Sequence, residues 1–116
     1  MTAVTVILSI LLAVGFAVAG AAKVTNHKTM VDAAAHVGVS QQNFAVIGGL
    51  EILGAVGLLV GIGLPTLGWL TALALLVLML GAVGFHVRAG DAPAGYTPAA
   101  ALGLVSLVVM ILDIAR

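Results

Sequence analysis

Four long apolar stretches, each nearly free of charge, constrain this 116-residue chain more than any other feature. A helix needs about 20 mainly apolar residues to cross roughly 30 Å of hydrocarbon. A soluble domain this small buries only about 60% of the surface that its unfolded chain exposes, so it could not hide a sequence that is 63% hydrophobic and 7% charged. We therefore expect a multi-pass protein of the cell membrane, surrounded by the lipid bilayer. The stretches cover residues 3–22, 44–64, 67–87 and 98–115.

The four stretches are expected to be helices, because a bilayer forces each spanning segment to satisfy its own backbone polar groups unless a barrel closes. Each stretch is also about twice as long as a barrel strand. The expected fold is all-α, a transmembrane four-helix up-down bundle that forms a single membrane domain over residues 1–116. Small residues four positions apart would let such helices approach closely, although glycine is common in membrane helices in any case. These pairs are Gly15 with Ala19, Gly57 with Gly61, and Ala99 with Gly103.

The segments between the stretches predict how the helices are joined. Residues 64–66 allow only a tight reversal. Residues 26–37 have an amphipathic helical pattern that ends at Gly38, which predicts a short interfacial helix at the mouth of the bundle, with a solvated linker as the alternative. Ser40 is expected to cap the second span. Residues 91–96 resemble a loop, after which Thr97 and Pro98 would cap and begin the fourth span.

The up-down topology places most charged residues at one end of the bundle. Lys23, Lys28 and Arg88 lie there and only Arg116 lies at the other end, which weakly favours a cytoplasmic polar end with both termini outside. A competing interpretation of the first span is a cleaved signal segment, but residues 1–6 contain no basic residue. Equal numbers of basic and acidic residues, 4 of each, make a nucleic-acid partner unexpected.

Glu51 is the most informative of these residues. It lies about 10 Å along its helix from Phe44, at roughly 1.5 Å per residue, which is too deep to reach water unaided. A buried carboxylate is either protonated or paired with a cation. The candidates for its partner are Lys23, His86 and Arg88. The sequence leaves two interpretations open, a polar intramembrane pocket that binds a small molecule or relays protons, and an ion pair that only fixes the helix register.

The histidines allow more than one interpretation. His86 is either an interfacial residue or, if it faces Glu51, half of an acid–base pair, so Glu51 and His86 are the candidate catalytic residues. His27 and His36 do not have the spacing with which one helix binds a metal ion, and no metal site is expected.

Asp113 is expected to pair with Arg116 or to reach the interface. The absence of cysteine excludes disulfides and thiolate chemistry.

The same residues carry a resemblance to the DoxX-like membrane proteins. Residues 20–23, Gly-Ala-Ala-Lys, resemble the end of that family's first span, and residues 48–54, Gly-Gly-Leu-Glu-Ile-Leu-Gly, resemble its second-span motif with a central glutamate. His86, Arg88 and Asp91 resemble the polar run that closes the third span. The resemblance extends from about residue 13 to residue 114. It implies a compact four-helix membrane bundle in which Lys23, Glu51, His86 and Arg88 line a polar, ligand-binding site.

Two functions are compatible with that resemblance. The family takes its name from a subunit of a thiosulfate:quinone oxidoreductase, which implies an accessory subunit of a membrane redox or assembly complex, with protein partners or further copies of the chain around it. The alternative is a membrane enzyme or binding protein for a small lipophilic substrate, quinone-like or polyprenoid, that uses acid–base chemistry at Glu51 and His86. No haem or flavin motif is visible, and no bound cofactor is expected beyond such a quinone. Proton or solute conduction is a third hypothesis, which has less support because few polar residues lie between Glu51 and the opposite end of the bundle.

Overall fold

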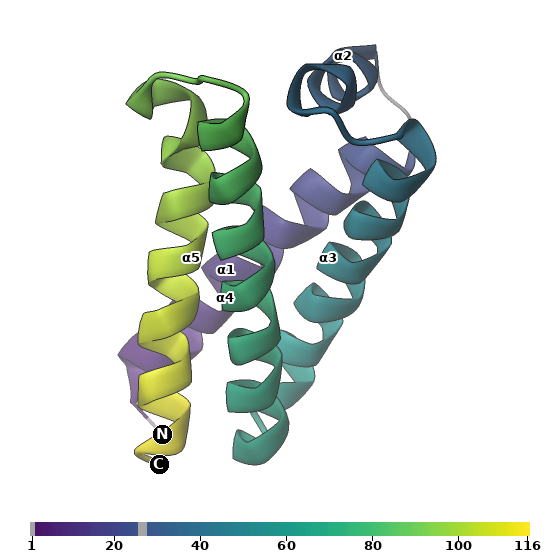
Figure 1. The fold of residues 1–116 in the computed structure, drawn as a ribbon. Coiled ribbons are helices and arrows are strands. Elements are labelled where there is room, and N and C mark those ends of the chain that lie inside the picture. The colour runs from purple at the N-terminus through teal and green to yellow at the C-terminus, as the bar shows by residue number, and fades with distance from the viewer. Residues whose placement is uncertain (1, 26–27) are drawn as a thin grey trace.

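The computed structural model describes residues 2–25 and 28–116, and this part of the chain forms five α-helices and no strand (Figure 1). Four of them are long and apolar enough to cross a membrane, which confirms the predicted helix content. The fifth, α2, is short. The bounds are Ala3–Val24 for α1, Lys28–Val37 for α2, Gln41–Gly61 for α3, Pro65–Arg88 for α4 and Pro93–Ile114 for α5.

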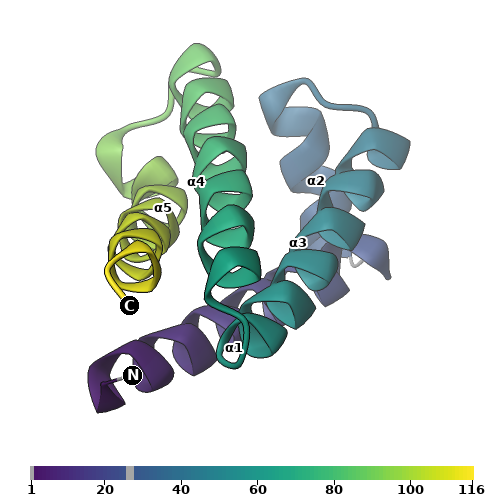
Figure 2. The same ribbon diagram turned by 90° about the horizontal axis from the view of Figure 1, so that it is seen from below.

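The long helices are arranged as two closely packed pairs, α1 with α3 and α4 with α5, which meet through α3 and α4 and through α1 and α5. Two views show α1 crossing the other helices obliquely (Figures 1 and 2). Both termini lie at one end of the molecule, and α2 and the α4–α5 loop lie at the other (Figure 1). The up-down arrangement and a membrane-surface position for α2 remain predictions.

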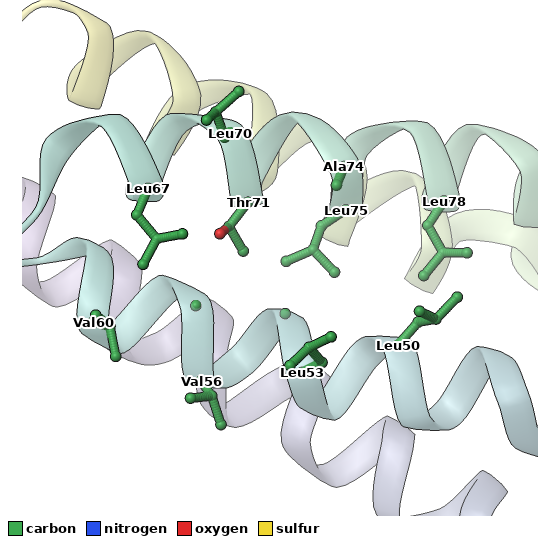
Figure 3. Close-up of a pocket in the computed structure, with 12 residues that line it drawn as sticks. Leu50, Leu53, Val56, Val60, Leu67, Leu70, Thr71, Ala74, Leu75 and Leu78 are labelled. Atoms are coloured by element: carbon green, nitrogen blue, oxygen red, sulfur yellow. The ribbon is translucent and has the colours of Figure 1, made fainter.

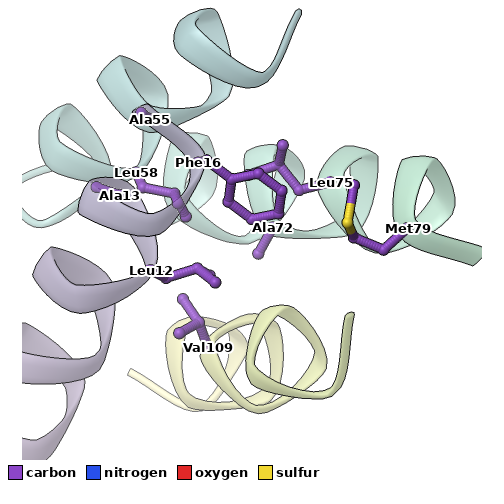
Figure 4. Close-up of a cluster of buried hydrophobic side chains, with 9 residues drawn as sticks. All are labelled: Leu12, Ala13, Phe16, Ala55, Leu58, Ala72, Leu75, Met79 and Val109. Carbon is purple, nitrogen blue, oxygen red and sulfur yellow. The ribbon is translucent and has the colours of Figure 1, made fainter. Parts of the chain in front are cut away.

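The core lies where the four long helices meet. Phe16 of α1 and Val109 of α5 are fully buried, and Leu58 of α3 and Ala72 of α4 pack into the same cluster (Figure 4). Burying a large apolar side chain among such neighbours stabilises the fold through close packing. The exposed faces of the same helices are rich in leucine and valine, as expected of helices that contact lipid.

Glycines bring helices together at both ends of the structure. A Cβ on Gly20 would lie 2.5 Å from the carbonyl oxygen of Gly48, so the two glycines let α1 and α3 cross almost backbone to backbone. Gly61 and Gly68 bring α3 and α4 equally close beside their connecting turn. The sequence pointed to Gly61 but not to this crossing of α1 and α3.

The helix ends agree with the sequence at two places and differ at a third. Gly38 has a positive φ of 76° after α2, and the Ser40 hydroxyl accepts a hydrogen bond from the backbone N–H of Asn43, as an N-cap does. The predicted loop over residues 91–96 was wrong for residues 93–96, because α5 already begins at Pro93. Proline is preorganised for the first turn of a helix, and two prolines compete for that position here. Pro98 therefore lies inside α5, and Thr97, instead of capping it, donates its hydroxyl to the Pro93 carbonyl.

Candidate functional site

An ion pair between Lys23 and Glu51 joins α1 to α3. Lys23 lies in the last turn of α1, and its Nζ is 2.7 Å from Oε1 of Glu51. The close crossing of Gly20 and Gly48, one helical turn away from the pair on each helix, brings the two side chains within reach. Of the three partners that the sequence allowed for Glu51, the structure selects Lys23. The pair links the two helices at the end of the molecule where α2 lies.

The two members of this pair differ in their surroundings. The Glu51 side chain is only 1% exposed, whereas that of Lys23 is 16% exposed. The Phe44 ring lies 5.3 Å from the Lys23 Nζ, a cation–π distance. The Lys23 ammonium reaches Oε1 of Glu51, and no other hydrogen-bond donor reaches that oxygen among the described residues. A carboxylate can accept several hydrogen bonds, and burying one that is only partly satisfied is costly.

This ion pair lies on the wall of a cavity of about 530 Å³. All five helices contribute to the walls, and α2 contributes Met30, Ala33 and Val37. The volume falls within the range of small-molecule sites, about 300–1,000 Å³. Apart from the ion pair and His86, the lining side chains are apolar or glycine: Ala19, Met30, Ala33, Val37, Val39, Phe44, Ile47, Val77, Leu78, Met79, Gly81, Ala82, Phe85, Gly95, Pro98, Ala99 and Leu102.

A second polar cluster holds α2 to the α4–α5 loop at the same end. Asp91 in that loop binds His86 of α4 through Oδ2, 2.6 Å from Nδ1, and binds His36 of α2 through Oδ1. These hydrogen bonds, that of His86 first and that of His36 second, hold the pKa of Asp91 below its ordinary value of 3.8. We call His36, Asp91 and His86 the clasp. Among the described residues, no group of three or more His, Asp or Glu is arranged to bind a metal ion.

The predicted site residues do not all come together. Lys23, Glu51 and His86 line the cavity, whereas Arg88 is exposed on the last turn of α4 and is not among the lining residues. His86 bonds to Asp91 rather than to Glu51. His27 lies outside the described residues. The ligand-binding and catalytic roles of these residues remain predictions.

The opposite end of the molecule contains a second buried carboxylate. Asp113 of α5 pairs with Arg116 at 3.0 Å, as predicted. Arg116 also donates hydrogen bonds to the carbonyl oxygens of Gly61 and Ile62 at the end of α3. The carboxylate packs directly on Gly68 of α4. The arrangement fastens α5 to the α3–α4 turn, a structural role.

A separate groove of about 600 Å³ lies between α3 and α4 (Figure 3). Leucine and valine side chains from both helices line it, and Thr71 is its one hydroxyl-bearing residue. Several of these side chains, among them Leu53 and Leu70, are exposed. Neither an ionisable group nor a histidine lines the groove, so it offers apolar contact and no site for proton transfer.

Comparison with known proteins identifies one family. The model of the DoxX-like family matches residues 7–110 of the chain, which is most of its length. The matched range includes Lys23, Glu51 and His86. No curated protein and no solved structure matches the chain.

Proposed function

Because the chain belongs to the DoxX-like family and is a membrane protein with four transmembrane helices, we propose that it binds a small lipophilic molecule in the cavity beside Lys23 and Glu51. The observation that carries this proposal is the position of the ion pair, which is buried on the wall of an otherwise apolar cavity of about 530 Å³. A site with apolar walls and one polar group orients a ligand by its head group and holds its chain by contact. Quinone-like and polyprenoid molecules both have this form. The membrane is proposed to be the cell membrane.

A reaction on such a ligand would use the ionisable groups of the same cavity. Glu51 and His86 both line it and are the candidates for proton transfer. Because Asp91 occupies Nδ1 of His86, the other ring nitrogen is the one left for a ligand. Substituting Glu51→Gln tests this step, since a catalytic carboxylate is needed for turnover even where binding persists.

Filling the cavity tests the binding proposal. Ala82 lines the cavity, and Ala82→Phe should place a ring inside it. Gly84 on the same helix has no atom within 4 Å of an added Cβ and does not line the cavity, so Gly84→Phe is the matched control. Native mass spectrometry of protein released from mild detergent should show a retained lipophile on the original chain and on Gly84→Phe, and none on Ala82→Phe. An equal retained mass on all three proteins would contradict the proposal.

The second proposal is the accessory role that the family implies. An accessory subunit of a membrane redox or assembly complex needs a surface for an apolar helix of a partner, and the groove between α3 and α4 is open and apolar. Ala74 lines this groove, so Ala74→Trp should release partners that copurify with the original chain in mild detergent, while Gly84→Trp should retain them. A lone, monodisperse protein with full activity would end this proposal.

A further inference from the structure

We propose that the cavity selects a neutral lipophilic alcohol, whose hydroxyl group binds to both Lys23 and Glu51, over a lipophile with a charged head group. The inference rests on the binding function proposed above and names the chemical class of the ligand. Its evidence is the charge balance of the cavity wall and the hydrogen-bonding capacity of the ion pair.

The charge balance favours a neutral head group. The positive charge of Lys23 and the negative charge of Glu51 lie 2.7 Å apart and offset each other. The remaining ionisable residue on the wall, His86, is bound through Nδ1 to the carboxylate of Asp91. An anion or a cation that entered these apolar surroundings would find its counter-charge already paired, and an unpaired charge in such a place is strongly unfavourable.

The hydrogen-bonding capacity favours a hydroxyl over a head group that only accepts. Oε1 of Glu51 is buried, and the Lys23 ammonium at 2.7 Å is the one group among the described residues that reaches it, so the carboxylate can accept a further hydrogen bond. The Lys23 side chain, by contrast, is 16% exposed and carries an ammonium group, which can donate three hydrogen bonds. A hydroxyl donates to the carboxylate and accepts from the ammonium at once, whereas a carbonyl or ether oxygen accepts from Lys23 and gives the carboxylate no second donor.

The rest of the cavity fits an apolar chain attached to that head group. Ala19 and Ile47 lie one helical turn from Lys23 and Glu51 on their own helices, and both line the cavity. Farther along the walls, Leu78, Met79 and Leu102 provide apolar contact from α4 and α5. A single chain therefore leads away from the polar pair without meeting another charged side chain on the lining.

Three photoreactive probes with the same alkyl chain test the inference. One has a hydroxyl head group, one a sulfonate and one an ammonium, and each is added at low mole fraction to the full-length protein in bilayer nanodiscs. Mass spectrometry then gives the labelling of cavity residues relative to Leu11, which is exposed and lies outside the cavity lining, so that the ratio corrects for partition into the bilayer. We expect the alcohol to label the cavity about tenfold more than either charged probe, the size of effect expected of one hydrogen bond to a charged group.

Changing one member of the pair should change the preferred probe. Glu51→Gln leaves the charge of Lys23 unpaired and should shift the preference to the sulfonate, whereas Lys23→Met should shift it to the ammonium. The double variant Lys23→Met, Glu51→Gln has a neutral wall again and should lose both shifts. Asp113→Asn alters a carboxylate at the opposite end, outside the cavity lining, and is expected to keep the original preference.

The outcomes separate the two proposals. If no probe labels the cavity more strongly than it labels Leu11, the binding function itself is contradicted. Cavity labelling that is equal for the three probes, or strongest for a charged probe on the original chain, leaves the binding function in place and overturns the inference about the alcohol. A shift in preference with Asp113→Asn equal to that with Glu51→Gln would also overturn it, because the selectivity would not come from the pair on the cavity wall.

Discussion

Each end of this molecule contains an ion pair with a buried carboxylate, but the two pairs have different surroundings. At each end a carboxylate that is almost fully buried pairs with a basic residue, Glu51 with Lys23 and Asp113 with Arg116. At the Asp113 end the carboxylate packs against the backbone of Gly68. At the Glu51 end the carboxylate lines a cavity of about 530 Å³.

That difference shows that a buried ion pair does not by itself define a functional site. Arg116 also donates hydrogen bonds to the carbonyl oxygens of Gly61 and Ile62, so the pair at that end links α5 to the end of α3. The Lys23 ammonium contacts Glu51 and lies over the Phe44 ring, and the Lys23 side chain is still partly exposed. The packing around each pair, more than its charge, therefore separates the pair that fastens helices together from the pair proposed to bind a ligand.

The largest expected loss of stability comes from breaking the pair of Asp113 with Arg116, at the end of the molecule where the carboxylate packs tightly on Gly68. Asp113→Asn removes the buried carboxylate that neutralises Arg116 and should lower the free energy of unfolding by about 3 kcal/mol, the lower limit for breaking a buried pair. Glu51→Gln at the cavity should cost about 1 kcal/mol, closer to the loss of one hydrogen bond, because the cavity leaves room for the neighbouring side chains to adjust. Unfolding of both variants in detergent measures the difference, and equal losses would contradict the comparison.

A smaller loss of stability is expected from a larger side chain at Gly61, in the same tightly packed end of the molecule. The Cβ of Gly61→Val would overlap the backbone of Gly68, which cannot move without opening the α3–α4 turn. Overpacking of this kind costs about 1–3 kcal/mol, and we expect about 2 kcal/mol in the same unfolding assay. Gly49 on the same helix has no atom within 4 Å of an added Cβ. Gly49→Val is the control, and a loss of stability equal to that of Gly61→Val would show that the close approach does not stabilise this end.

The sequence predicted features that depend on local pattern or on depth in the membrane. The four apolar stretches gave the four long helices, because length and hydropathy alone decide whether a segment can span a bilayer. Glu51 was expected in the interior because no water reaches its depth in the helix. Asp113 was expected to pair with Arg116 or to reach the interface, and the two residues, close together in the sequence, do pair.

Features that depend on how distant helices approach each other could not be predicted. The sequence left three partners open for Glu51, and only the crossing of Gly20 over Gly48 selects Lys23. The contact between His36 and Asp91 joins residues 55 positions apart, and no periodicity connects them. The start of α5 was misplaced because Pro93 and Pro98 are both suited to a first helical turn, and local chemistry does not choose between them.

The smallest expected effect concerns the clasp, which exists only at the cavity end. Because hydrogen bonds from His86 and His36 lower the pKa of Asp91, folding favours its ionised form. The contribution of ionised Asp91 to stability is complete above the ordinary pKa of 3.8 and is lost as the pH falls through the lowered value.

Asp91→Asn should remove that contribution at neutral pH, so amide exchange in α2 should quicken by about three- to tenfold, as for one weakened hydrogen bond. Asp32, exposed on α2, supplies the control Asp32→Asn, which should leave exchange unchanged. In the original chain α2 should stay protected at neutral pH and lose protection only well into the acid range. If Asp91→Asn leaves exchange in α2 unaltered at neutral pH, the clasp does not hold this helix over the cavity, and α2 is held by its apolar contacts alone.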